Sequence, residues 1–141
     1  MGVQPISRER FAVTIGIVVG MVCNMVVLQI GMQAYPPPVD LDPNDAAQMS
    51  EWVQMMSLPQ LLFVFVAHIS QAGCGALAGC WTSRDNALRT GRLVGMISAL
   101  FCGLNLFLVP HPTWFWTEIP LCLAFGLGIG RVLQIPPNNQ E

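Results

Sequence analysis

The sequence predicts an all-α integral membrane protein, a four-helix bundle with a short helix on the outer membrane surface. The first observation is a set of four long apolar stretches, each about as long as the ~20 residues that cross ~30 Å of hydrocarbon as a helix. The second is composition, since 53% of the residues are hydrophobic and only 10% are charged. Soluble domains have about 25% charged residues. The third is that almost all charges lie outside the apolar stretches.

We expect one domain over residues 1–141, with spans at Phe11–Ala34, Pro59–Thr82, Leu88–Val109 and Trp114–Leu133. Little of the chain then remains for a soluble domain. The first stretch follows Arg8 and Arg10, as the apolar part of a signal peptide would. Its apolar run is too long for that role, and the sequence at 32–34 is a poor cleavage site, so we expect it to be retained.

The arginines orient the chain, which has no lysine. They lie before the first span, between the second and third or in the first turns of the third, and at the end of the fourth: Arg8, Arg10, Arg84, Arg89, Arg92 and Arg131. The connections at 35–58 and 110–113 contain no basic residue. The positive-inside rule therefore predicts that both termini are cytoplasmic and that the 35–58 loop is outside. The net charge of −2 argues against a nucleic-acid partner.

The outer loop contains the signals of a short helix. The prolines of the run 35–38 end the first span, because consecutive prolines cannot continue a helix. Asp42 is then expected to cap a helix, with Pro43 at the first helical position and Asp45 in the first turn. An apolar stripe follows at helical spacing: Met49, Trp52, Val53 and Met56. We expect this stripe to rest on lipid or on the bundle, and binding of a partner is the alternative.

Every span carries a Gly-x-x-x-Gly pattern. The glycines are Gly16 and Gly20, Gly75 and Gly79, Gly91 and Gly95, and Gly126 and Gly130. Glycines four apart share one helix face and let two backbones approach closely, which is a main source of helix association in lipid. We expect a tight bundle, with a small face left over for another subunit.

Six polar side chains fall within the spans and form the candidate polar site: Asn24, Gln29, His68, Gln71, Asn105 and Glu118. Such groups are expensive in the membrane and usually face the bundle interior. His68 is the ionisable residue nearest a span centre, and we expect its partners among Asn24, Gln71 or a backbone carbonyl. Glu118 is interpreted as lying near the outer interface. We prefer interhelical hydrogen bonding to a proton or substrate pathway.

Two further features concern the outer side. Pro120 removes the usual hydrogen-bond donor to the carbonyl of Trp116, so we expect a kink that opens a small outer pocket. His111 lies between two prolines in the second outer turn, where we expect it to be exposed and without a functional role.

The five cysteines all fall within the spans: Cys23, Cys74, Cys80, Cys102 and Cys122. None forms a Cys-x-x-Cys pair, so their spacing supports neither a redox motif nor a zinc site. We expect free, buried thiols, no metal site and no cofactor.

Several motifs resemble a group of small bacterial four-span membrane proteins of uncharacterised function. They are Tyr-Pro-Pro-Pro at 35–38, Asp-Pro-Asn-Asp at 42–45, Ala-His at 67–68 and Asn-Leu-Phe-Leu-Val-Pro-His-Pro-Thr-Trp-Phe at 105–115. The resemblance covers about residues 11–131. It implies the four-span fold and a bacterial membrane, and it implies no activity. We expect a multi-pass protein of the inner membrane.

Two function classes follow from these observations. The first is a structural or accessory subunit that packs against other membrane helices or against itself within the lipid bilayer. The alternative is a small transporter or small-molecule-binding membrane protein with a polar site near Gln29, His68, Asn105 and Glu118. We do not expect an enzyme, because no nucleophile and base stand out as a pair.

Overall fold

The computed structural model describes residues 5–135, and within that range it contains helices and no strand. The long helices are α1 (Pro5–Ala34), α3 (Leu58–Thr82), α4 (Ala87–Leu108) and α5 (Glu118–Leu133). A short helix α2 (Ala46–Met55) and two 3₁₀ turns, η1 (Arg84–Asn86) and η2 (Thr113–Thr117), connect them. Four helical segments are long and apolar enough to cross a membrane. The all-α four-helix fold is therefore confirmed, and by length and composition the chain is a multi-pass membrane protein.

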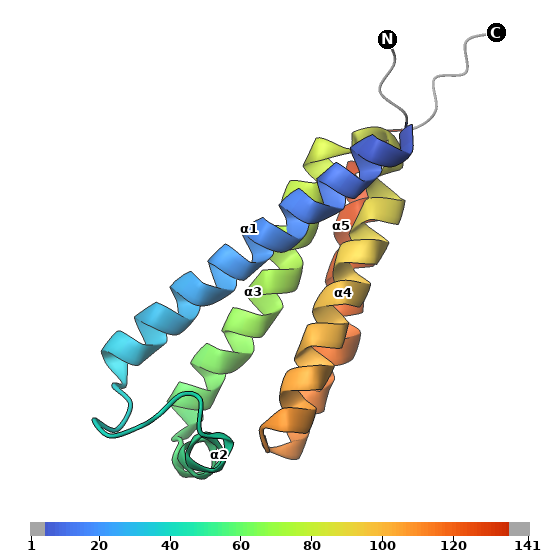
Figure 1. The fold of residues 1–141 in the computed structure, drawn as a ribbon. Coiled ribbons are helices and arrows are strands. Elements are labelled where there is room, and N and C mark those ends of the chain that lie inside the picture. Colours follow the sequence, from blue (N-terminus) through green and yellow to red (C-terminus); the bar gives the residue numbers. More distant parts are fainter. Residues whose placement is uncertain (1–4, 136–141) are drawn as a thin grey trace, which may run out of the picture.

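The long helices form two pairs, α1 with α3 and α4 with α5 (Figure 1). Helix α3 also contacts α4 and α5, and so it joins the pairs. The pairs lie close together at the end of the bundle that carries both termini and diverge toward the end where α2 lies (Figure 1). We call these the terminal end and the α2 end.

Glycines bring α1 and α3 into backbone contact. A Cβ atom built on Gly16 would lie 2.7 Å from the carbonyl oxygen of Gly75, and one built on Gly75 would lie 2.7 Å from that of Gly16. Gly20 faces the backbone of Gln71, and Gly79 faces that of Ala12. Side chains at these positions would separate the helices, so the absence of Cβ atoms sets the distance between them.

The second pair is built in the same way. Gly91 on α4 and Gly126 on α5 each face the carbonyl oxygen of the other, too close for a Cβ atom. A Cβ on Gly95 would lie 2.9 Å from the carbonyl oxygen of Cys122, and one on Gly130 would lie 2.9 Å from that of Ala87. All eight glycines of the four patterns thus face neighbours inside the bundle.

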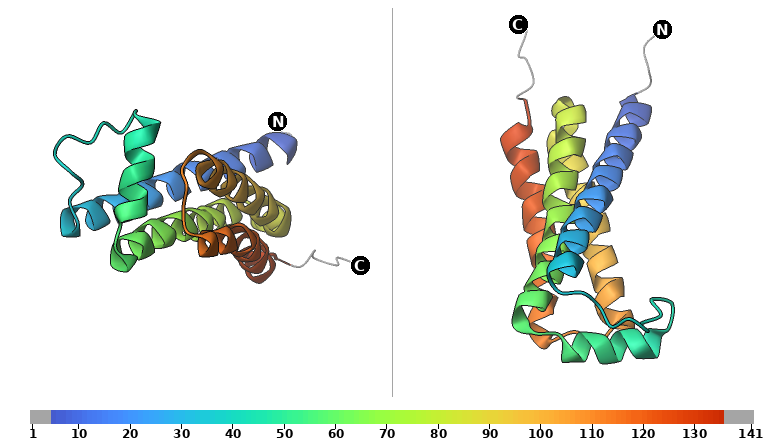
Figure 2. Two further views of the ribbon diagram at one scale, coloured as in Figure 1. Left: turned by 90° about the horizontal axis from the view of Figure 1, so that it is seen from below. Right: turned by 90° about the vertical axis from the view of Figure 1, so that its left-hand side faces the viewer.

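Helix α2 lies across one end of the bundle (Figure 2). Its buried residue Val53 belongs to a cluster with Leu61, Leu106 and Phe115, so α2 rests on the bundle. This packing agrees with the first of the two expectations for the apolar stripe.

The start of α2 differs from the sequence prediction. Asp45, and not Asp42, is the N-cap, and its side chain accepts hydrogen bonds from the backbone of Ala47 and Gln48. The Asp42 carboxylate instead accepts from the backbone N–H of Asn44 at 2.9 Å and closes a turn of its own. Either aspartate could cap a helix, but Asp42 stabilises the preceding turn and Asp45 caps α2.

The surroundings of Pro120 also differ from the sequence prediction of a continuous span from residue 114. The fourth span begins as the 3₁₀ turn η2, and α5 starts only at Glu118, so Pro120 lies in its first turn. The N–H groups of a first turn have no intrahelical acceptor, so proline there removes no helical hydrogen bond. A proline at this position does not by itself require a kink.

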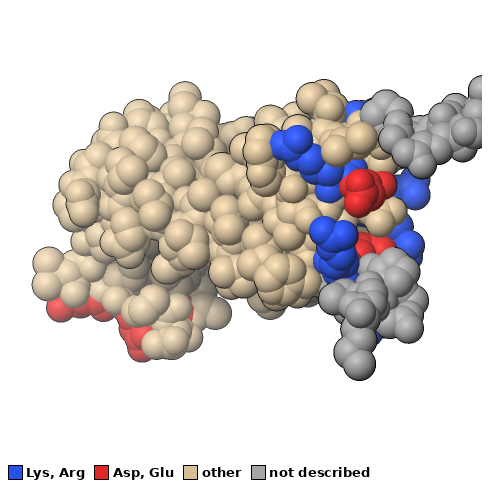
Figure 3. Space-filling model, turned by 90° about the horizontal axis from the view of Figure 1, so that it is seen from above, with Lys and Arg blue, Asp and Glu red and all other residues tan. Residues whose placement is uncertain are grey.

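Charges gather at the two ends of the molecule (Figure 3). At the terminal end, Arg89 Nε donates to Glu9 Oε1 at 2.9 Å, and the Arg84 guanidinium lies 3.7 Å from the ring centre of Trp81. The aspartates of the 35–58 loop lie at the other end (Figure 3).

Candidate functional site

The centre of the candidate site is a pair formed by His68 on α3 and Glu118 at the start of α5. The Nδ1 atom of His68 lies 2.8 Å from Oε2 of Glu118. The side chain of Glu118 is 0% exposed and that of His68 is 13% exposed. The expectation that His68 bonds to Asn24, Gln71 or a backbone carbonyl is therefore wrong, and Glu118 is buried within the bundle.

Glu118 reaches the interior because of the turn that precedes it. Phe115 in η2 is fully buried against Leu61 and Leu106. This contact anchors the turn inside the bundle, so that α5 begins there and its first residue points inward. The sequence pattern alone places Glu118 four residues into a span, where it would lie near the headgroups.

The pair suits a dry environment. If the ring also carries a proton on Nε2, the bonding proton can belong to the imidazole or to the carboxyl group, and in both cases the pair is neutral overall. A hydrocarbon interior strongly favours neutral over charged groups. The second carboxyl oxygen, Oε1, is different: it is buried and has no hydrogen-bond partner among the described residues.

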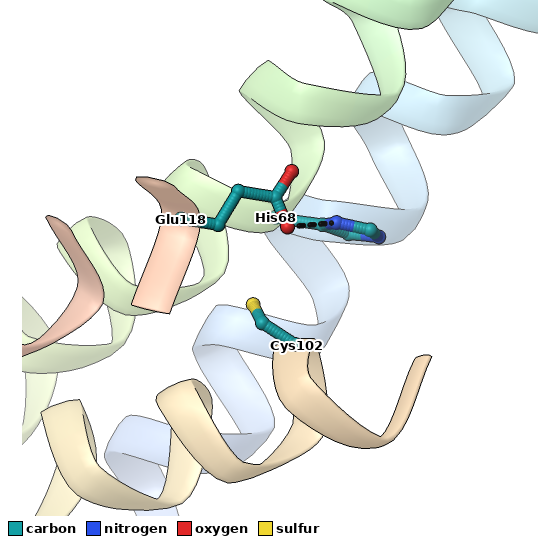
Figure 4. Close-up of side chains that lie close together, drawn as sticks. All are labelled: His68, Cys102 and Glu118. Atoms are coloured by element: carbon teal, nitrogen blue, oxygen red, sulfur yellow. Dashed lines mark hydrogen bonds and ion pairs between the residues drawn. The ribbon is translucent and has the colours of Figure 1, made fainter. Parts of the chain in front are cut away.

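A cysteine from a third helix completes the cluster. Cys102 on α4 is buried, and its Sγ lies with a ring nitrogen of His68 and a carboxyl oxygen of Glu118 in a group whose atoms are all within 4.8 Å of one another (Figure 4). The Sγ of Cys122, on α5, lies 3.7 Å from that of Cys102. All five cysteines are free thiols.

Sequence reasoning missed Cys102 because the cluster is assembled from three separate helices. Glu118 lies 50 residues after His68, and Cys122 lies 20 residues after Cys102. One local signal was available, since Glu118 and Cys122 are four residues apart and must share a helix face.

A cavity of about 240 Å³ lies beside His68, near the α2 end. Its walls come from α1, α2, α3 and α4 and are mostly apolar and aromatic: Leu28, Met32, Trp52, Phe63, Val64 and Val109. Its polar lining includes His68, Asn105 and His111. Of the residues in the buried cluster, His68 alone lines this cavity.

The remaining predicted site residues do not all converge. Asn105 lines the cavity together with His68. Gln29 is exposed on the far side of α1, because nine residues after Gly20 correspond to about half a turn around a helix. Asn24 is buried and Gln71 is half-buried, but neither side chain is the hydrogen-bond partner of His68. Gln29 is therefore not part of the site.

His111 also differs from the sequence prediction, because it lines the cavity beside His68. It is half-buried rather than exposed, and its Nδ1 donates to the carbonyl oxygen of Val109 at 2.7 Å. Its ring centre lies 4.7 Å from that of Phe115. Burial lowers the pKa of His111, so the ring is neutral at pH 7 and presents an uncharged polar group to the cavity.

Comparisons of the chain with protein-family models, curated proteins and solved structures find no match. The resemblance to small bacterial four-span proteins stays a prediction, and the functional argument depends on the geometry of the site.

Proposed function

We propose that the protein binds a small lipophilic molecule in the cavity near the α2 end and holds its hydrogen-bonding group at His68. The observation that supports this most directly is the cavity itself, an apolar space within the helix bundle with few polar groups on its wall. Binding sites for small molecules have this composition, because apolar walls supply affinity and a few polar groups fix orientation.

His68 is prepared for this role by Glu118. The carboxyl group occupies Nδ1 and fixes the orientation of the ring. Within residues 5–135 the ring makes no other hydrogen bond, so its Nε2 atom is available to a ligand. A hydroxyl or carbonyl group on the ligand would satisfy it, and the Asn105 amide on the same wall offers a second contact.

The volume limits the class of molecule. A cavity of about 240 Å³ is somewhat smaller than the ~300–1,000 Å³ typical of sites for drug-sized ligands. It therefore suits a ring-sized head group and not a whole lipid. We infer a lipophilic molecule with one polar ring, whose tail, if it has one, extends into the bilayer.

Co-purification tests this proposal. The wild-type protein is purified in mild detergent, and organic extracts are searched by mass spectrometry for a lipophilic compound in a fixed ratio to the chain. Val64→Trp fills the cavity and should remove the compound. Val66→Trp is the matched control, because Val66 lies on the same helix and is 52% exposed. Equal recovery from wild type and a folded Val64→Trp protein would refute the proposal, as would a wild-type extract without such a compound.

An accessory-subunit role is the second candidate, favoured by the outer face of α1. Only 17% of the residues in the most apolar part of this helix are buried in the bundle. Its exposed face carries Gln29 and Gln33 among apolar side chains, and amide groups on a membrane helix form hydrogen bonds with neighbouring helices. Gln29→Leu should then reduce the size of the complex seen by cross-linking in membranes, whereas Val18→Leu on the same helix should not. An unchanged complex in both variants would exclude this face as an interface.

We also propose the inner-membrane orientation that the arginines predict, with the terminal end in the cytoplasm. The support is the asymmetry of basic residues, since the arginines lie at the terminal end of the bundle and none lies in the connections at the α2 end. The cavity would then open toward the outer leaflet.

A further inference from the structure

We propose that His68, Cys102 and Glu118 form a binding site for one divalent transition-metal cation of the Zn²⁺ class. This site lies on the buried side of His68, and Cys102 and Glu118 do not line the cavity. The inference shares His68 with the proposed function but does not require a molecule in the cavity.

The distances are close to those of a metal centre. The three ligand atoms all lie within 4.8 Å of one another. Zinc binds nitrogen and oxygen at about 2.0–2.2 Å and sulfur at about 2.3 Å, so ligand atoms in a tetrahedral site lie about 3.3–3.7 Å apart. The His68 Nδ1 and Glu118 Oε2 atoms, 2.8 Å apart in their hydrogen bond, would separate by about 0.5 Å or more, and the Cys102 sulfur would move inward by less than about 1 Å. Side-chain rotation can supply both movements. The bound ion would then join α3, α4 and α5.

The donor set favours a borderline or soft cation. Thiolate and imidazole ligands select zinc or copper over magnesium and calcium, which prefer sites made of oxygen atoms alone. The charges also balance. One thiolate, one carboxylate and a neutral imidazole around a divalent ion give a neutral centre, and the membrane interior strongly penalises any net charge.

An independent observation points to a ligand here. Glu118 is fully buried, and its Oε1 atom has no partner among residues 5–135. An unsatisfied carboxyl oxygen in this environment is costly, and His68 accounts only for Oε2. A metal ion bound by the carboxyl group would remove the penalty.

Cys122 has a supporting role in this arrangement. Its Sγ lies 3.7 Å from that of Cys102, at a distance where a neutral thiol can donate to a thiolate. Such a contact orients a ligand without supplying another one. If Cys122 were a second thiolate ligand, the metal centre would carry a net negative charge. We therefore do not count Cys122 among the metal ligands.

Cobalt provides the test, because Co²⁺ takes zinc geometries and thiolate ligation gives it a charge-transfer band in the near ultraviolet. The full chain is purified in detergent, treated with a chelator and titrated with Co²⁺. We expect a band that saturates at one cobalt per chain and disappears on addition of Zn²⁺. Cys102→Ser should abolish the band, and Glu118→Gln should weaken cobalt binding at least tenfold. Cys74→Ser, the matched control at a free thiol outside the cluster, should retain the band.

Three outcomes would overturn the assignment: no saturable band in folded wild-type protein, a band that survives in Cys102→Ser, or a band lost in Cys74→Ser. A melting curve for each variant shows whether it has folded. The proposed function is tested separately, because Val64→Trp should lose the co-purified molecule and keep cobalt binding. Cys102→Ser should show the reverse.

Discussion

The close contact between α4 and α5 makes Gly126→Ala a sharp test of the packing. A Cβ atom at this position would lie 2.8 Å from Cα of Gly95 and 3.1 Å from its backbone nitrogen, and closer still to the carbonyl oxygen of Gly91. All three are backbone atoms, so no side chain can rotate out of the way. The helices must separate by about 1 Å to restore ordinary contact distances.

The cost of this separation follows from overpacking. A methyl group inserted into a tightly packed site costs about 1–3 kcal/mol, and the rigid backbone on both sides places this site toward the upper end of that range. Gly128→Ala is the control, since a Cβ atom there meets nothing within 4 Å. The same substitution on the same helix should change stability by less than about 1 kcal/mol, which is the difference in helix propensity between the two residues.

Reversible unfolding in mixed micelles measures both variants. Increasing the fraction of sodium dodecyl sulfate unfolds the bundle, and tryptophan fluorescence follows the transition. We expect the unfolding free energy of Gly126→Ala to fall by about 2–3 kcal/mol relative to wild type. If Gly126→Ala and Gly128→Ala differ by less than about 0.5 kcal/mol, backbone contact between α4 and α5 does not support the fold as argued.

Three further predictions concern orientation, capping and the buried pair. Asn44→Cys should react with an impermeant maleimide in intact cells and Asn86→Cys only after lysis; equal labelling would refute the orientation. Asp45→Ala should reduce stability by about 1 kcal/mol in thermal denaturation, because two backbone N–H groups of α2 lose their acceptor; an unchanged melting temperature would show that the cap contributes nothing. His68→Leu should reduce stability by about 1–3 kcal/mol by leaving the Glu118 carboxyl group without its partner, whereas His68→Gln should retain a donor and cost less; equal losses in the two variants would contradict this account.

The spans and the glycine contacts could be predicted from sequence because both depend on local patterns. Length and apolarity define a membrane helix, and glycines four apart must lie on one face. The cap of α2 shows where this reasoning becomes ambiguous. Asp42 and Asp45 offer the same side chain, and the choice between them depends on where the loop can reach the bundle.

The candidate site was harder to predict because it depends on tertiary arrangement. The partner of His68 is set by how α5 is rotated and by how deep it begins, and both follow from the burial of Phe115 in the preceding turn. Cys102 belongs to the site because α4 packs against α5. The spacing of the cysteines along the chain does not reveal this packing. Gln29 was misplaced for a simpler reason, since its face of α1 could have been worked out from its offset to Gly20.

Seven of the eight glycines of these patterns lie in the half of their helix nearer the terminal end, and Gly20 lies at the middle of α1. The two helix pairs approach each other at that end (Figure 1). A bundle of this shape that spans a bilayer would be narrow in one leaflet and broad in the other, where α2 lies. A wedge of this shape displaces more lipid area from one monolayer than from its partner. Many copies inserted in the same orientation would bend a membrane, and a curved bilayer with its broad leaflet on the convex side would accommodate the protein with less strain than a flat one.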